Sequence, residues 1–280
     1  MIKPFLQDDA FLEDVASADM GPNTLHLWWL GQSGFLLAWN GKHLLLDPYL
    51  SDSLTRKYAD TDKPHVRMTE RVVDPSRLDF IDVVTSSHNH TDHLDAETLV
   101  PLMQANPKLR MAIPEANRTF VTERLGCARD WPVGLDAGET IDVAGVRIHG
   151  VPAAHETIER DAEGHCVFMG YVAELGPFRV YHSGDTVLFE EMEDILRPFA
   201  VDVALLPING ANPERRVAGN LDGAEAARSA KAIGAGVVVP CHYDMFEFNT
   251  ATPESFERTC REIGQAFAVV KVGERWSIRK

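Results

Sequence analysis

Cysteine is scarce in this sequence, and its cysteines do not stand at metal-binding spacing. The 280 residues contain four of them, Cys127, Cys166, Cys241 and Cys260, and no two form a CxxC pair. This spacing argues against a zinc finger built on thiolates. Four scattered thiols also do not make the dense disulfide framework of small secreted proteins. We therefore expect buried, reduced thiols and a cytoplasmic protein.

Long apolar runs and excess positive charge are also lacking. No run approaches the ~20 apolar residues that cross a bilayer, and residues 1–20 carry acidic side chains early, unlike a signal peptide. The chain has 27 Lys and Arg against 42 Asp and Glu, a net charge of -15. This balance argues against a broad nucleic-acid surface and against adsorption to anionic membranes. We expect a small-molecule partner, and the composition leaves a homo-oligomer open.

Apolar and polar residues follow a pattern typical of a globular α/β protein. Asn40-Gly41 marks a hairpin between two early strands. Residues 51–76 form a long polar loop, and loops of that length in a compact domain are usually functional. We predict strands at 24–30, 35–39, 43–47, 80–85, 110–113, 140–143, 146–151, 167–174, 178–182, 203–206, 237–240, 269–272 and 276–278, and helices at 5–16, 95–105, 115–125, 188–197, 221–233 and 253–265. Hairpin strands followed by β-α units, twice over, predict two packed sheets with helices outside, in one domain of residues 1–280.

The strongest chemical signal is the segment Ser87-His88-Asn89-His90-Thr91-Asp92-His93. It follows an apolar strand and precedes a helix, which is where α/β folds bind ligands. Imidazole nitrogens and carboxylate oxygens are the ligands that zinc and similar divalent ions take in proteins. A tight loop presents these groups in two directions, which suffices for two adjacent ions. The alternative, a solvated histidine-rich loop, is disfavoured because three of the eleven histidines fall within six positions.

Three further strand ends carry a histidine or an aspartate. His155 follows the strand at 146–151, Asp185 follows that at 178–182, and His242 follows that at 237–240. Each of them alone would be an ordinary loop residue. Together with the histidine-rich segment, they supply the series of ligands that a two-metal site needs.

This order of ligands resembles the metallo-β-lactamase superfamily, whose signature is HxHxDH followed by a later His, an Asp and a final His. The resemblance implies a four-layered αβ/βα sandwich and two divalent ions, zinc or manganese, with iron also compatible. It implies that His88, His90 and His155 bind the first ion, that Asp92, His93 and His242 bind the second, and that Asp185 bridges the two. A hydroxide between the ions would attack the substrate, and Asp92 would be the catalytic group that orients it and accepts a proton.

Several segments narrow the resemblance to the L-ascorbate-6-phosphate lactonase branch of this superfamily. They are Trp29-Leu-Gly-Gln-Ser-Gly-Phe35, Leu46-Asp-Pro-Tyr-Leu-Ser-Asp52, Leu206-Pro-Ile-Asn-Gly210, Gly219-Asn-Leu-Asp222 with Glu225-Ala226, and Pro240-Cys-His-Tyr-Asp-Met-Phe246. The resemblance implies a lactonase-like hydrolase. Residues 156–165 match no pattern of that branch, and a shared fold does not fix the substrate.

Three polar residues near these segments have two interpretations each. Asp47 stands at a strand end before Pro48, so it could orient a metal-bound histidine or cap a turn. His182 stands three residues before Asp185, and we expect a core histidine more than a partner of the metal site. Ser33 in Gly-Gln-Ser-Gly is expected to be a turn residue, because Gly-x-Ser-x-Gly is absent and a metal site needs no serine nucleophile.

Candidate substrate contacts are the polar residues beside the ligand-bearing loops. Asn209 and Tyr243 are our candidates for donating a hydrogen bond to the substrate. Arg215 and Arg216 could bind a phosphate as a pair or be solvated loop charges. The remaining histidines lack partners at ligand spacing, and we expect them to be structural or exposed; they are His26, His43, His65, His149 and His165.

Three functions are compatible with these residues. The leading hypothesis is a metal-dependent hydrolase acting on a small cytoplasmic substrate, in particular the lactone of a phosphorylated sugar acid. The second is a metal-dependent phosphodiesterase, which the same site chemistry permits. The third is a metal-binding sensor or scaffold without catalysis, which is disfavoured because loss of catalysis usually removes ligands and every ligand position is filled.

Overall fold

Two β-sheets pack face to face at the centre of the molecule. The computed structural model describes residues 1–280. One sheet has seven strands in the order β13-β1-β2-β3-β4-β5-β6, and the other has six in the order β12-β11-β10-β9-β8-β7. The strands are β1 (Thr24–Gly31), β2 (Gly34–Trp39), β3 (Lys42–Leu46), β4 (Val83–Thr85), β5 (Arg110–Pro114), β6 (Val133–Leu135), β7 (Thr140–Val143), β8 (Val146–Pro152), β9 (Met169–Leu175), β10 (Phe178–His182), β11 (Val203–Pro207), β12 (Val237–Cys241) and β13 (Arg275–Arg279).

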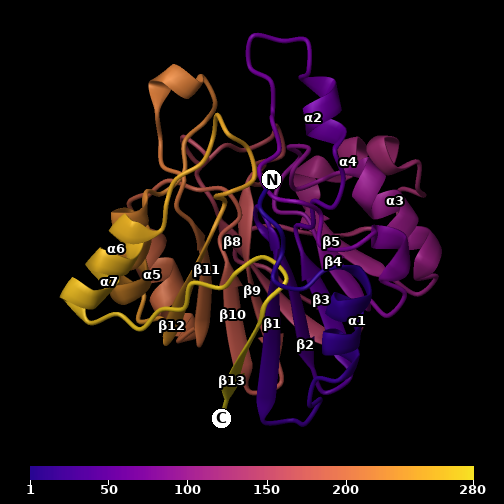
Figure 1. Ribbon diagram of the computed structural model, residues 1–280, viewed down its shortest axis with the longest axis horizontal. Helices are drawn as coiled ribbons and strands as arrows, with labels where there is room; N and C mark the ends of the chain where they lie inside the picture. The colour runs from indigo at the N-terminus through magenta and orange to yellow at the C-terminus, as the bar shows by residue number, and fades with distance from the viewer.

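Helices cover the outer face of each sheet (Figure 1). The helices are α1 (Asp8–Ala16), α2 (Ser53–Lys57), α3 (Ala96–Ala105), α4 (Arg118–Leu125), α5 (Met192–Leu196), α6 (Gly223–Ala232) and α7 (Glu254–Ile263). In Figure 1, α1, α3 and α4 lie beside the seven-stranded sheet, whereas α5, α6 and α7 lie beside the six-stranded one. The predicted four-layered sandwich is therefore confirmed. None of the helices has the length and apolar character that crossing a bilayer requires.

Burial explains why the apolar runs form central strands. Every residue of β1 and of β11 is buried, as expected for strands covered on both faces. A single cluster of 67 buried apolar residues takes in side chains from both sheets. On the outside, α6 begins at a capping box in which Asp222 and Glu225 each accept a hydrogen bond from the other's backbone N–H. The sheets and their helices thus form a rigid base beneath the loops.

Parallel strands bring several chain segments to one edge of the sandwich. The strands β3, β4 and β5 are parallel to one another, and so are β10, β11 and β12. Because the carboxyl ends of parallel strands lie at the same edge, the loops that follow them meet there. Asp47 follows β3, the segment His88–His93 follows β4, Asp185 follows β10 and His242 follows β12. This edge carries the candidate site.

Five predicted elements need correction, and one strand was missed. The predicted loop 51–76 contains α2, and the predicted strand at 269–272 is wrong, because Val272 makes only an isolated bridge to Trp29. Strand β6 was not predicted, since its three residues are too few to show a period and pair only with β5. The helices predicted at 5–16 and 188–197 and the strand predicted at 80–85 begin later, at Asp8, Met192 and Val83. The errors fall on short elements and on element ends, where the sequence pattern is weakest.

Candidate metal centre

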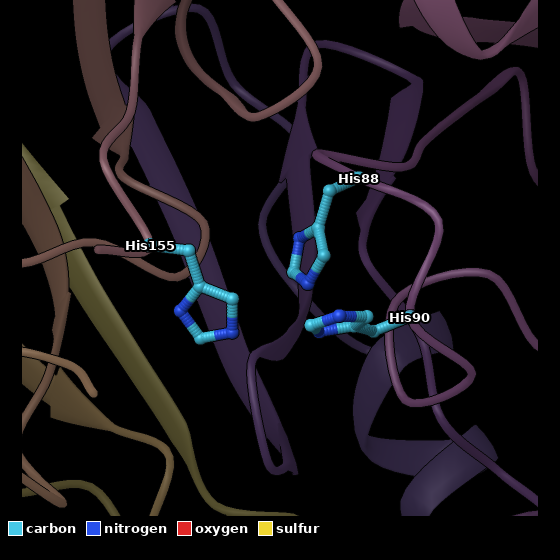
Figure 2. A group of neighbouring side chains, drawn as sticks. All are labelled: His88, His90 and His155. Atoms are coloured by element: carbon cyan, nitrogen blue, oxygen red, sulfur yellow. The ribbon is translucent and has the colours of Figure 1, made fainter. Parts of the chain in front are cut away.

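Three histidine rings converge at the strand-end edge. One ring nitrogen from each of His88, His90 and His155 lies within 4.8 Å of the other two. The ring centroids are 4.6 Å apart for His88 and His90 and 5.0 Å apart for His90 and His155. Figure 2 shows two of the rings on the loop after β4 facing the third from the segment after β8. This is the first group of ligands that the sequence predicted, and the structure brings it together.

A second group lies directly beside the first. Ligand atoms of Asp92, His93 and His242 also lie within 4.8 Å of one another, as do those of His88, His93 and Asp185. Asp185 sits between the groups: its Oδ1 lies 3.2 Å from His93 Nε2, and its Oδ2 lies 3.1 Å from His242 Nε2 and 3.8 Å from His155 Nε2. All seven residues predicted as metal ligands therefore lie in one cluster.

The unpaired polar atoms of this cluster fit a cation. His88 Nε2, His93 Nε2 and Asp185 Oδ1 are buried without a hydrogen-bond partner. Buried polar atoms without partners are costly and rare in folded proteins. A divalent ion would accept electron pairs from all three atoms, and imidazole with carboxylate is the ligand set of such ions. The residues present therefore fit a bound metal.

The protonation of His88 and Asp185 favours the same interpretation, whereas burial at His93 is outweighed by Asp185 and Asp92, which hold the pKa of that ring well above its ordinary value. Burial, together with the neighbouring rings of His93 and His90, holds the pKa of His88 well below its ordinary value. Burial alone would raise the pKa of Asp185, but His242 and His93 outweigh it and hold that pKa well below its ordinary value. A neutral imidazole and an ionised carboxylate are the forms in which these groups bind metal.

Asp47 orients His93 from below the cluster. Its Oδ2 lies 2.8 Å from His93 Nδ1, and it accepts further hydrogen bonds from Thr85 Oγ1 and from the hydroxyl and backbone N–H of Ser87. With its proton on Nδ1, His93 presents a free electron pair on Nε2 to the cluster. The two interpretations of Asp47 thus combine, since the same carboxylate fixes the ring and holds the start of the histidine-rich loop.

The other ligands are held in similar ways. His155 Nδ1 lies 3.1 Å from the carbonyl oxygen of Gly219, which leaves Nε2 to face Asp185. Gly184, just before Asp185, has a φ of +60°, and a Cβ there would lie 2.6 Å from the Cβ of Ser87. The segment before Asp185 therefore lies against the start of the histidine-rich loop. Only glycine permits an approach this close without displacing one of the loops.

Non-glycine residues with positive φ gather at this site. Gln32, Asp47 and His242 have φ values of +50°, +39° and +62°. Such conformations are uncommon for residues with a Cβ, and they cluster where function requires a particular side-chain direction. Each of these three residues ends or follows a central strand and turns its side chain toward the cluster.

Gln32 is a residue of the site that the sequence analysis missed. It lies in the turn between β1 and β2 and is only 1 % exposed. Its Nε2 lies 2.8 Å from Asp92 Oδ2 and 3.0 Å from His242 Nε2. The sequence indicates only a turn at Gly31-Gln-Ser-Gly34, and nothing in that pattern shows which way the glutamine points.

A cavity of about 370 Å³ opens above the cluster. Its floor includes His90, Asp92, His155, Asp185 and His242. One side is formed by the segment from α2 to residue 66 and by residues 246–249, which contribute Tyr58, His65, Phe246 and Phe248. His65, predicted to be structural or exposed, is half-buried and packs its ring into this wall. Part of the predicted loop 51–76 thus lines the cavity above the candidate metal site.

The two residues predicted to contact substrate lie behind the cavity wall. The ring of Tyr243 is 4 % exposed and packs against Trp29 at a centroid distance of 4.6 Å. Asn209 donates to Asn249 Oδ1 and accepts from Asn220, and it is these two partners that line the cavity. The structure gives Tyr243 and Asn209 packing and bracing roles in place of the predicted substrate contacts. A residue that stands next to a metal ligand in the sequence, as Tyr243 stands next to His242, therefore need not face the cavity.

The two arginines predicted either to bind a phosphate or to be solvated loop charges make different contacts. Arg215 donates to the carbonyl oxygens of Asn209 and Thr250. Arg216 instead forms an ion pair with Asp62 on the loop after α2. Arg215 therefore joins the loop after β11 to the loop after β12, and Arg216 joins the loop after β11 to the loop after α2.

The remaining alternatives are resolved by hydrogen bonds. The Nε2 of His182 lies 2.9 Å from the carbonyl oxygen of Ser33, and the histidine is buried, as expected for a core residue. Ser33 is buried beside this contact and does not line the cavity. The interpretation of Ser33 as a turn residue therefore agrees with its position.

Comparison with known proteins gives the family of the chain. A family model described as a beta-lactamase superfamily domain matches residues 42–243. A "UPF0173 metal-dependent hydrolase" of Rubrobacter xylanophilus is 31% identical over 255 residues, which cover 88% of this chain and 93% of the relative. Both matches include the residues of the metal cluster from His88 to Asp185.

Solved structures share the fold at low sequence identity. An isothiocyanate hydrolase from Delia radicum gut bacteria superposes with a TM-score of 0.71 at 21% identity, over 91% of this chain and 100% of that one. CmlA, a diiron β-hydroxylase from Streptomyces venezuelae, superposes with a TM-score of 0.65 at 16% identity, over 94% of this chain and 55% of that one. These structures show the same fold, and the family model and the relative from Rubrobacter xylanophilus identify the chain as a metal-dependent hydrolase that belongs to the metallo-β-lactamase superfamily.

Proposed function

We propose that the chain is a two-metal hydrolase. In this proposal, His88, His90 and His155 bind one divalent ion, Asp92, His93 and His242 bind the other, and Asp185 bridges them. The observation that carries the proposal is the position of Asp185, because one of its oxygens faces His93 and the other faces His155 and His242. The ligands suit zinc or manganese, and the diiron protein of the same fold keeps iron compatible.

Asp92 is the residue to which we assign the proton transfer. Ions bound at this site would act as Lewis acids and lower the pKa of water toward about 7. Asp92 lines the cavity, so its carboxylate can orient a water molecule and accept its proton. Burial alone would raise the pKa of Asp92, but the neighbouring His93 and His242 lower it below the ordinary value. The carboxylate is therefore ionised.

We propose a small lactone as the substrate, in the cytoplasm. The segments shared with the L-ascorbate-6-phosphate lactonase branch support this proposal, and they make the lactone of a phosphorylated sugar acid the first compound to test. The cationic side chains that line the cavity are Lys57 and Arg124. The phosphodiesterase and the non-catalytic sensor are the alternatives that the same test must separate.

The test combines metal analysis with a substrate panel. Protein purified without added metal should contain close to two divalent ions per chain and hydrolyse a lactone, and removal of the ions by a chelator should abolish turnover. The panel contains lactones, phosphodiesters and an isothiocyanate, the last because of the structural neighbour that hydrolyses one. Hydrolysis of phosphodiesters alone would replace the lactone proposal, and bound metal without turnover of any compound would support the sensor. Turnover that survives complete metal removal would refute the metal-dependent mechanism.

A further inference from the structure

The side chain of Gln32 lies where the second group of ligands would hold its ion. The carboxamide nitrogen is 2.8 Å from Asp92 Oδ2 and 3.0 Å from His242 Nε2, two of the atoms assigned to that ion. The carboxamide oxygen, Oε1, is buried without a hydrogen-bond partner. Gln32 therefore directs its donor at the atoms that a cation would need and leaves its acceptor unused.

This arrangement cannot persist when a cation binds. An amide nitrogen has no free electron pair, and its hydrogens repel a positive charge. A half-turn of the terminal torsion, which is broad and roughly two-fold in glutamine, exchanges the nitrogen and the oxygen. The oxygen then faces Asp92 and His242, so that three electron-rich atoms converge in the way a divalent ion requires.

We propose that Gln32 Oε1 is an additional ligand of the ion held by Asp92, His93 and His242, an inference that rests on the proposed two-metal function. The positive φ of Gln32 directs the side chain inward from the turn between β1 and β2. An extra oxygen ligand raises the coordination number at this position and makes it richer in oxygen. Such a site favours manganese or iron over tetrahedral zinc.

The test is the metal affinity of two Gln32 variants. Q32L removes the oxygen that would bind the ion, so it should keep one ion per chain and bind the second at least about tenfold more weakly. About tenfold is the lower end of the loss seen when a residue that only contacts a metal ligand is replaced. Q32E keeps an oxygen in place and should retain both ions. The readouts are the metal content after dialysis and competition against a chromogenic chelator, supported by the Co²⁺ absorption spectrum, which should change in Q32L and much less in Q32E.

Asn249→Leu is the matched control, because it also removes a carboxamide that lines the cavity but contacts Asn209 and Arg215 instead of the ligands. It should bind both ions as the unmodified protein does. Equal affinity of Q32L and the unmodified protein for two ions would overturn the assignment alone. Equal losses in Q32L and Q32E would show that Gln32 acts through its N–H group, which also overturns it. An unmodified protein without bound metal would refute the proposed function as well.

A separate observation concerns the wall of the cavity. The ring of His65 stacks on Tyr58 at a centroid distance of 4.2 Å and contacts Phe248 at 4.4 Å and Phe246 at 5.2 Å. Burial of His65 lowers its pKa, so the ring is neutral at physiological pH. These four rings are in contact with one another through His65 and form one aromatic wall of the cavity.

One cationic group of the cavity is engaged by the backbone, and the other lies on the aromatic wall itself. The Arg124 guanidinium donates to the carbonyl oxygens of Asn89 and Leu94 and stacks on Phe120. The ammonium of Lys57 lies over the ring of Tyr58 at 5.0 Å from its centroid. A phosphorylated substrate therefore meets one free ammonium, that of Lys57, beside an aromatic wall. An uncharged apolar group finds a surface that it can cover.

From this wall we infer the substrate class, which rests on the proposed lactone hydrolysis but differs from the phosphorylated sugar lactone: a lactone that carries an aryl or other planar apolar group. The probes are a γ-butyrolactone with a phenyl substituent and the same ring with a hydroxymethyl substituent. We expect kcat/KM to be at least about tenfold higher for the phenyl compound, since a single methylene in an apolar pocket is worth about 10- to 200-fold. F248A should bring this ratio close to one.

Phe5→Ala is the control for this test, because Phe5 is an exposed phenylalanine outside the cavity and its loss should leave the ratio unchanged. Equal kcat/KM values for the two lactones would overturn the aromatic subsite and leave the two-metal hydrolase intact. If neither lactone is hydrolysed, the affinities of the two ring-opened acids are measured by calorimetric titration. The aromatic subsite then requires that the acid with the phenyl substituent binds more tightly than the acid with the hydroxymethyl substituent.

Discussion

Replacing Asp185 by alanine is expected to release the bound metal and to lower kcat/KM by at least about 100-fold, the upper end of the loss caused by removing even an outer partner of a metal site. The reason is geometric, because the two oxygens of this one carboxylate face His93 on one side and His155 and His242 on the other. No other carboxylate of the cluster reaches both groups of ligands in this way. The loss should therefore affect both ions. H88A should have a similarly severe effect, since His88 belongs to two of the three ligand groups, one with His90 and His155 and one with His93 and Asp185.

The measurement is metal content by elemental analysis together with lactone hydrolysis. Asp142→Ala is the matched control, because Asp142 is exposed and pairs with Arg147 far from the cluster. It should keep both metal content and turnover. D185A protein that retained two ions and normal kcat/KM would disprove the bridging role of this carboxylate.

Replacing Asp47 by asparagine is expected to weaken metal binding by about 10- to 100-fold without a direct contact to the ion. The carboxamide that D47N introduces would place an N–H group against His93 Nδ1, where the carboxylate now accepts. The proton of His93 would then move to Nε2, the atom that must bind the ion. The substitution thus changes Nδ1 of the ring from a hydrogen-bond donor into an acceptor and removes an electron pair from the site.

The alanine variant separates this effect from stability. D47A also removes the acceptor of Thr85 and Ser87 and leaves buried donors without partners, so it should lower the free energy of unfolding by about 3–5 kcal/mol, as breaking a buried charged pair does. D47N should lose far less stability in the presence of a chelator. Asp95→Asn is the control, because Asp95 is another buried aspartate that accepts from a threonine, Thr98, and it does not contact the cluster. Metal binding by D47N that equals that of D95N would contradict the orienting role.

The sequence was most informative where local pattern and chemistry coincide. The central strands could be predicted because their apolar runs are short, uninterrupted and bounded by turn residues, as at β11 and β12. The ligands could be predicted because each follows such a strand, and parallel strands bring their ends to one edge. The same reasoning gave Asp47, which follows β3 and reaches His93 across the sheet.

The walls of the site could not be predicted in this way. Tyr58, His65 and Phe248 lie on two loops far apart in the chain, and only their tertiary packing brings the rings together. The direction of Gln32 depends on a positive φ in a turn, which its neighbours in sequence do not specify. For Tyr243, the adjacent His242 suggested a substrate contact, but the backbone turns its ring into the core beside Trp29.

The ligands come from both sheets, and this division has a consequence for the lifetime of the protein. His88 to His93 follow a strand of the seven-stranded sheet, whereas His155, Asp185 and His242 follow strands of the six-stranded one. Ions bound by ligands from both sheets would oppose the separation of the two sheets. Free metal at about 100 times its dissociation constant adds about 2.7 kcal/mol to the free energy of unfolding. A shortage of metal would then lower the stability of the chain and increase its proteolysis, in addition to abolishing its activity. The supply of metal would thus control the amount of protein as well as its activity.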